Sequence, residues 1–133
     1  MKILHIDQNH PVLWSELSVL GYKNTQGYSL TREEVLSIIE SYDGVVIRSR
    51  ILIDRAFLDA AKQLKFIARV GAGLDAIDTD YAAEKGVLLI SAPEGNSNAV
   101  GEHALGLLLN LLNNINRADR ELRQGLGRRE PNR

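Results

Sequence analysis

The sequence predicts a doubly wound α/β fold, with a flavodoxin-like parallel sheet of about five strands followed by a long C-terminal crossover helix. Two observations support it. Apolar runs of strand length alternate with segments of helical spacing along residues 1–90, and a leucine-rich segment without proline follows them. Strands of a parallel sheet lie between helices on both faces, so they read as apolar runs without polar alternation.

The individual elements follow from local signals. Strands are expected at 2–6, 22–25, 44–47, 64–70 and 87–90. Helices are expected at 12–20, from Thr31 onward, at 54–61 and at 79–85. Gly21 is placed to end the first helix, and Thr31 with Glu34 forms a capping-box pattern at the start of the second.

The last predicted element is one helix from about Asn98 to about Gln124, roughly 40 Å long at 1.5 Å per residue. Its leucines surround the axis, and a helix that is apolar all round needs cover on every side. Gly101 and Gly106 are its weakest points. We therefore expect a substrate-binding domain at 1–97, an inter-domain or dimerisation helix at 98–124 that builds a homodimer, and a linker or frayed tail at 125–133.

Composition narrows the function classes. The chain has 133 residues, a net charge of −1 and no cysteine. The balance of charge gives no reason to expect nucleic acid or an anionic membrane as a partner. The absence of cysteine removes disulfides and thiolate metal sites, and no residue pattern indicates a metal. The apolar stretch 104–112 is too short to cross a bilayer. The apolar core of the N-terminal segment is too short for a signal peptide, and together with the absence of cysteine this leads us to expect a cytoplasmic protein.

The segment 71–76 reads GAGLDA and fits the glycine pattern of a dinucleotide loop. Three observations oppose that reading. The segment follows the fourth expected strand instead of the first, the next helix begins near Asp78, and several aspartates would repel a phosphate. Two alternatives remain: a tight turn, or a nest of backbone N–H groups from Gly71, Ala72 and Gly73 that binds an anion.

Arg48, Ser49 and Arg50 follow the third expected strand directly. Ligands of open α/β sheets bind at the carboxyl ends of the strands, and arginine offers paired donors to carboxylate or phosphate. The alternative is a pair of solvated surface cations. Asn96 follows an Ala-Pro-Glu-Gly turn and is either a ligand contact or a turn residue.

The order of these motifs resembles the family of NAD-dependent D-2-hydroxyacid dehydrogenases, and within it the members that act on D-3-phosphoglycerate. The resemblance rests on the glycine loop 71–73, the strand after it, the turn at Ala92-Pro93 and the leucine-rich helix. It implies a small anionic 2-hydroxyacid as substrate. The residues that it places at the substrate are Arg48, Ser49, Arg50, Gly71, Ala72, Gly73 and Asn96. It places Val100 near the nicotinamide.

In that family the catalytic arginine, histidine and glutamate and the NAD-binding domain lie further along the chain. This sequence ends at Arg133, so we expect a truncated substrate-binding region without a catalytic residue and without activity of its own. Glu102 and His103 are adjacent and point about 100° apart on a helix, so they cannot act as an acid–base pair. At Leu126-Gly127 the family usually has a tryptophan instead.

A second hypothesis is a stand-alone flavodoxin-like module for dimerisation or interaction, without catalysis. A phosphate-receiver version is opposed by Asp7, which has no companion acid, and by Arg48 at the end of the third strand. An FMN-binding version is opposed by the segment 7–12, which lacks a Ser/Thr-Gly phosphate loop. Binding of small hydroxyacids would separate the two hypotheses.

Overall fold

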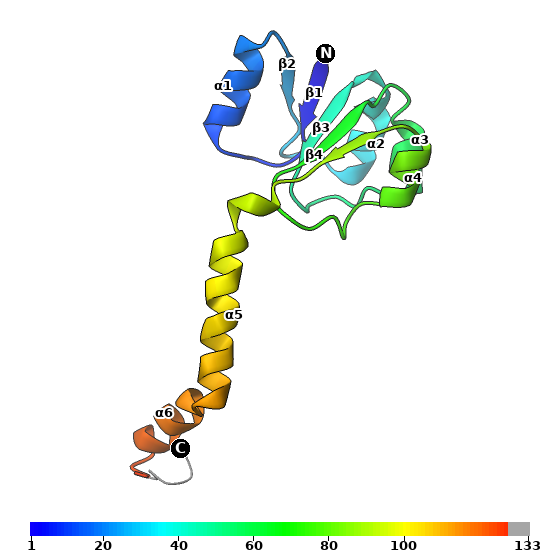
Figure 1. The fold of residues 1–133 in the computed structure, drawn as a ribbon. Coiled ribbons are helices and arrows are strands. Elements are labelled where there is room, and N and C mark those ends of the chain that lie inside the picture. Colours follow the sequence, from blue (N-terminus) through cyan, green and yellow to red (C-terminus); the bar gives the residue numbers. More distant parts are fainter. Residues whose placement is uncertain (128–133) are drawn as a thin grey trace. The chain divides into compact units, whose positions relative to one another are not determined.

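The computed structural model describes residues 1–127 and consists of two compact units, Met1–Pro93 and a second unit that begins at Glu94. The first unit alternates strands and helices (Figure 1), in the order β1 (Lys2–His5), α1 (Pro11–Val19), β2 (Lys23–Gln26), α2 (Arg32–Ile38), η1 (Ile39–Ser41), β3 (Gly44–Ile47), α3 (Arg55–Ala60), β4 (Phe66–Arg69), α4 (Thr79–Glu84) and β5 (Leu88–Ile90). All five predicted strands are present, with ends shifted by at most two residues.

The five strands form one sheet in the order β2-β1-β3-β4-β5, and every pairing is parallel. This is the flavodoxin-like order that the sequence predicts. The chain runs outward from β1 to β2 and then reverses direction through β3, β4 and β5. Right-handed crossovers therefore place α1 on one face of the sheet and α2, α3 and α4 on the other.

The main core lies between the sheet and the three helices α2, α3 and α4. Its fully buried side chains include Leu4, Ile6, Val35, Val45, Phe57 and Ile67. The opposite face has only α1, which packs near β2. That face has an apolar hollow of about 420 Å³, lined by α1 and by strands β1, β3, β4 and β5, where Leu88 and Ile90 are exposed. Cover on both faces, as expected from the apolar strands, is thus incomplete within this unit.

Two predicted helix caps form as expected. Gly21 has φ +81°, and the N–H groups of Gly21 and Tyr22 donate to the carbonyl oxygens of Ser18 and Leu17, which closes α1 with a Schellman motif. At the start of α2, Thr31 and Glu34 exchange hydrogen bonds of 2.7 and 3.2 Å between backbone N–H and side-chain oxygen. These local signals set where the first two helices end and begin.

The second unit corrects the prediction of one unbroken helix over 98–124. It contains α5 (Ser97–Leu112) and α6 (Ile115–Arg123), and the short turn η2 (Pro93–Gly95) lies at its start. Asn114, between the two helices, has φ +53°, a left-handed conformation that asparagine adopts more readily than most residues. Gly101 and Gly106, the expected weak points, stay inside α5. The linker expected at 125–133 lies, from residue 128 on, outside the described residues.

Side-chain hydrogen bonds support the break. The Nδ2–H of Asn113 donates to the carbonyl oxygen of Leu109 at 3.0 Å. The Oδ1 of Asn110 accepts from the backbone N–H of Asn116 at 2.9 Å and so caps the first turn of α6. The side chains of Asn110 and Asn113 therefore take part in hydrogen bonds at the point where a continuous helix would use backbone groups alone.

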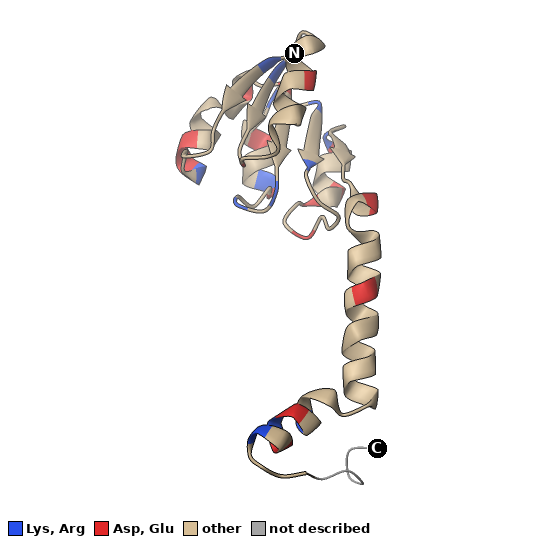
Figure 2. Ribbon diagram, turned by 90° about the vertical axis from the view of Figure 1, so that its left-hand side faces the viewer, with Lys and Arg blue, Asp and Glu red and all other residues tan. Residues whose placement is uncertain are grey.

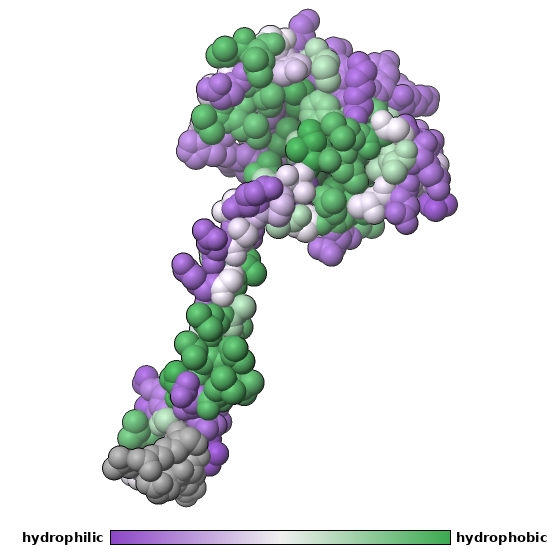
Figure 3. All heavy atoms as spheres, in the orientation of Figure 1, coloured by the Kyte–Doolittle hydropathy of each residue, from purple (hydrophilic) through white to green (hydrophobic). Residues whose placement is uncertain are grey.

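The surface of α5 is mostly apolar (Figures 2 and 3), whereas α6 carries charges of both signs. The large apolar side chains that α5 exposes are Val100, Leu105, Leu107, Leu108, Leu109, Leu111 and Leu112. Within residues 1–127, no helix is both long enough and apolar enough to cross a bilayer.

Candidate functional site

The candidate site forms at the carboxyl ends of β3 and β4, which are neighbours in the sheet with Ile47 opposite Arg69. Arg48 is the first residue after β3, and Arg69 is the last residue of β4. The Nε–H of Arg69 donates to the carbonyl oxygen of Arg48 at 3.2 Å. Two cationic side chains thus start from the same point of the sheet edge.

The glycine loop begins immediately beyond Arg69. Gly71 has φ +150°, a conformation that side chains rarely allow, and a β-carbon at this position would lie 1.7 Å from Nη1 of Arg69. The N–H of Gly71 donates to the carbonyl oxygen of Arg69, and its carbonyl oxygen accepts from the N–H of Ala92, both at 2.9 Å. Glycine at 71 is therefore favoured by the backbone conformation, and a side chain there would also displace the guanidinium that lies over it.

Several donors at this edge have no partner in the part of the chain that the structure describes. Among residues 1–127, the backbone N–H groups of Ala72 and Gly73 make no hydrogen bond, and Arg48 and Arg69 make no ion pair. The hydroxyl of Ser49 is likewise without a partner in that part of the chain. Guanidinium groups without an ion-pair partner, next to backbone N–H groups without an acceptor, suit a carboxylate or a phosphate.

The same loop does not fit the phosphates of a dinucleotide. The following helix α4 begins at Thr79, where Asp78 caps it by accepting from the N–H of Tyr81 at 3.0 Å, so its N-terminus is outside the glycine segment. A β-carbon added at Gly73 would lie 2.6 Å from Oδ2 of Asp75, so this carboxylate is next to the loop. A phosphate here would meet this negative charge, which opposes an NAD phosphate site at residues 71–76.

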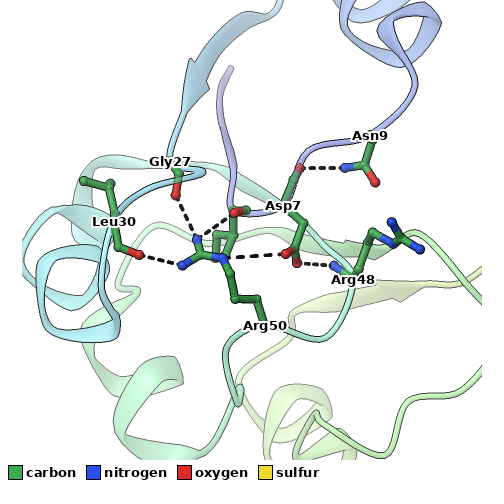
Figure 4. Close-up of polar contacts among 7 residues, drawn as sticks. Asp7, Asn9, Gly27, Leu30, Arg48 and Arg50 are labelled. Atoms are coloured by element: carbon green, nitrogen blue, oxygen red, sulfur yellow. Dashed lines mark hydrogen bonds and ion pairs between the residues drawn. The ribbon is translucent and has the colours of Figure 1, made fainter.

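The guanidinium of Arg50 turns away from this cluster (Figure 4). Its Nη1–H donates to the carbonyl oxygen of Leu30 at 2.7 Å, and its Nη2–H groups donate to those of Ile6 and Gly27 at 2.6 and 2.8 Å. Its Nε lies 3.6 Å from Oδ1 of Asp7. Arg50 is thus occupied by protein acceptors, whereas the resemblance implied a ligand contact for it.

Asn96 and Val100 belong to the second unit. Asn96 is the N-cap residue of α5, and its side-chain amide makes no hydrogen bond among the described residues. Val100 lies in the first turn of α5 with its side chain exposed. Glu102 and His103 also lie on α5 as adjacent residues.

Sequence reasoning did not identify two residues of this region. Arg69 had one signal, a cation at the last position of an otherwise apolar strand. Asp7 follows β1, and its Oδ2 accepts from the backbone N–H of Arg48 at 2.6 Å, 41 residues away. No local pattern shows such a contact, because it depends on β1 and β3 being neighbours.

The chain is similar in sequence to curated dehydrogenases. Curated relatives include the D-3-phosphoglycerate dehydrogenases of Methanocaldococcus jannaschii, 40% identical over 94% of this chain, and of Archaeoglobus fulgidus, 38% identical over 72% of it. The aligned regions are 24% and 18% of those two proteins. The chain therefore spans about a quarter or less of their length.

Solved structures show the same arrangement of elements. The PH0520 protein from Pyrococcus horikoshii OT3 has a TM-score of 0.88 at 27% identity, and the match covers 97% of this chain and 38% of that one. The NAD+-bound 3-phosphoglycerate dehydrogenase of Entamoeba histolytica has a TM-score of 0.63 at 27% identity, covering 83% and 38% of the two chains.

The sequence profile of the D-isomer-specific 2-hydroxyacid dehydrogenase catalytic domain matches residues 6–126, which is nearly the whole chain. Strands β2 to β5, the glycine loop after β4 and the leucine-rich α5 all lie within this match. The chain belongs to the D-isomer-specific 2-hydroxyacid dehydrogenase family.

Proposed function

We propose that this chain is the substrate-binding region of an NAD-dependent D-2-hydroxyacid dehydrogenase whose substrate is D-3-phosphoglycerate, an intermediate of serine biosynthesis. The observation that carries the proposal is that Arg48, Arg69 and the N–H groups of Ala72 and Gly73, which have no hydrogen-bond partner within residues 1–127, come from the same edge of the sheet. The names of the relatives support this substrate. The proposed location is the cytoplasm.

A phosphorylated hydroxyacid has two anionic ends, and the site offers two kinds of donor. The N–H groups of Ala72 and Gly73 suit the planar carboxylate. The hydroxyl of Ser49, the residue after Arg48, is a further donor to it. The guanidinium groups of Arg48 and Arg69 suit the phosphate, because each can donate two parallel hydrogen bonds. Asn96 and Val100, from the second unit, are proposed to contact the substrate and the nicotinamide.

The proposed parent reaction is hydride transfer between the hydroxyl-bearing carbon and NAD. The loop 71–76 does not fit a dinucleotide phosphate, so residues 1–133 alone are proposed to bind the substrate without oxidising it. Binding by this part of a cleft is expected to be weak, with a dissociation constant of about 1 mM, or about −4 kcal/mol.

The test is an NMR titration of the 133-residue chain with D-3-phosphoglycerate, with glycerol as the uncharged control ligand. Saturable shifts at 48–49 and 71–73 are expected, together with no NAD reduction. Shifts confined to other regions, or turnover above the buffer rate, would contradict the proposal.

A second function, dimerisation, is favoured by α5. Leu105, Leu107, Leu108, Leu109, Leu111 and Leu112 are each 45–76% exposed. Burying even four such side chains is worth roughly 6–12 kcal/mol, comparable with the stability of a whole domain. We propose that two chains associate through α5 as a C2 homodimer.

Sedimentation at about 100 μM tests the dimer, because association depends on protomer concentration. A Leu108→Asp variant is expected to sediment as a monomer, whereas Val19→Asp, at an exposed position of α1, should leave the mass unchanged. A wild-type chain that is monomeric and fully folded at that concentration would rule out this second function and leave the first intact.

A further inference from the structure

Arg50 and Asp7 join three segments of the chain, residues 6–7, 27–30 and 48–50 (Figure 4). The guanidinium of Arg50 reaches carbonyl oxygens at Ile6, Gly27 and Leu30, which lie 44, 23 and 20 residues away in sequence. Five N–H donors are available on an arginine, and three of them are used here on backbone acceptors. A side chain held in this way contributes rigidity to the segment that carries it.

Asp7 uses both of its carboxylate oxygens on the same segment. Its Oδ2 accepts from the backbone N–H of Arg48 at 2.6 Å, and its Oδ1 lies 3.6 Å from Nε of Arg50. The side chain of Asp7 is only 14% exposed, so the attraction between the two charges is weakly screened by solvent. The carboxylate therefore holds the turn at its first and third residues, 48 and 50.

The three arginines at this edge differ in whether a carboxylate balances their charge. The positive charge of Arg50 is matched by Asp7, whereas Arg48 and Arg69 have no ion-pair partner within residues 1–127. The carboxylate also fixes the backbone of Arg48 at the point where Arg69 donates to its carbonyl oxygen. Asp7 thus binds the backbone N–H of Arg48 and Arg69 binds its C=O, which limits the directions that the Arg48 side chain can take.

We propose that Asp7 and Arg50 are positioning residues, which hold the turn 48–50 so that Arg48 and Ser49 face the bound anion. Arg50 itself makes no contact with the ligand. This inference rests on the proposed function, because it concerns the same anion site. It assigns Arg50 a different role from its neighbour Arg48, although the two arginines are equivalent in the sequence pattern.

The experiment compares Asp7→Asn, Arg50→Gln and Asp43→Asn with the wild-type chain. Asp43 is a matched control, since its carboxylate accepts from the N–H of Lys2 at 2.8 Å and from Lys65 at 2.7 Å, next to the amino ends of the strands. Urea unfolding measures stability, and an NMR titration with D-3-phosphoglycerate measures the dissociation constant of the folded protein. Amide shifts and hydrogen exchange of Arg48 and Ser49 are recorded without ligand.

For Asp7→Asn and Arg50→Gln we expect shifted and faster-exchanging amides at 48–49 before ligand is added, and binding weakened about fivefold to tenfold, the scale of one hydrogen bond. Asp43→Asn should keep the wild-type dissociation constant. Variants that lose stability but bind as tightly as wild type would overturn the positioning role. So would weaker binding by Arg50→Gln with unchanged amides at 48–49, which would make Arg50 a direct ligand contact. Absence of binding by the wild-type chain would overturn the proposed function together with this inference.

Discussion

The Nε–H of Arg69 donates a hydrogen bond of 3.2 Å to the backbone carbonyl oxygen of Arg48, so that cations from β3 and β4 meet at one edge of the sheet. Neither guanidinium has an ion-pair partner in the described part of the chain, residues 1–127. Two arginines that start from adjacent strand ends, with no ion-pair partner among these residues, give this edge of the sheet a positive potential. This relationship leads to the first prediction.

Arg48→Gln and Arg69→Gln are each expected to weaken binding of D-3-phosphoglycerate about tenfold or more, because each removes a charge-assisted hydrogen bond. Binding by the wild-type chain should also weaken as salt screens the site. Calorimetric or NMR titration measures both effects. Arg55→Gln is the control, since that arginine pairs with Asp78 instead. Equal effects of all three substitutions would show that only net charge matters.

Gly71→Ala is expected to cost about 1–3 kcal/mol of unfolding free energy, because φ of +150° is strained for any residue with a side chain. The new methyl group would also displace the guanidinium of Arg69, so the ligand-induced shifts should disappear. Gly73→Ala should cost less, since it meets only the movable carboxylate of Asp75. Urea unfolding compares the two variants. A similar cost for both would contradict the strain at Gly71.

Asp54→Ala is expected to destabilise the first unit by about 0.5–2 kcal/mol, the usual cost of losing a helix N-cap. Asp54 accepts from the N–H of Phe57 at 3.0 Å and forms a two-bond pair with Arg32 at 2.6 and 2.7 Å. Asp54→Asn keeps an acceptor for the cap and loses only the charge. It should cost less than the alanine variant, because a partly exposed ion pair contributes little.

His5 is expected to make stability depend on pH. Burial lowers its pKa, against the opposing effect of its hydrogen bond with Asn24, and its ring lies 4.9 Å from that of Trp14. Because the pKa of His5 is lower in the folded state than in the unfolded state, its contribution to stability is complete above the unfolded pKa of about 6.5. That contribution is lost as the pH falls below this value.

Urea unfolding at about pH 7.5 and about pH 5.5 should therefore show lower stability at the acidic pH, with a slope of at most about 1.4 kcal/mol per pH unit. The His5→Gln variant should lose this dependence. The aspartates with lowered pKa, among them Asp43 and Asp54, titrate below this window and do not contribute to it. An identical pH dependence in wild type and variant would assign the effect elsewhere.

The sequence by itself determined the strands, their flavodoxin-like order, the caps at Gly21 and Thr31, and the late start of α4 that separates the glycine loop from a nucleotide loop. These features depend on local periodicity, on backbone conformation and on contacts within a few residues, all of which are written in consecutive positions. The same holds for the position of Arg48 at the carboxyl edge of the sheet.

Only the tertiary structure decided which arginine is free and which is held. Arg48 and Arg50 are two residues apart, yet Arg50 finds acceptors at Ile6 and Gly27 while Arg48 stays unpaired among the described residues. Strand order brings these partners close although they are far apart in the sequence, so no local sequence pattern predicts them. The helix break at Asn114 has a different cause, because it depends on local competition between asparagine side chains and helical hydrogen bonds, such as the bond between Asn110 and Asn116, and its position became clear only from the structure.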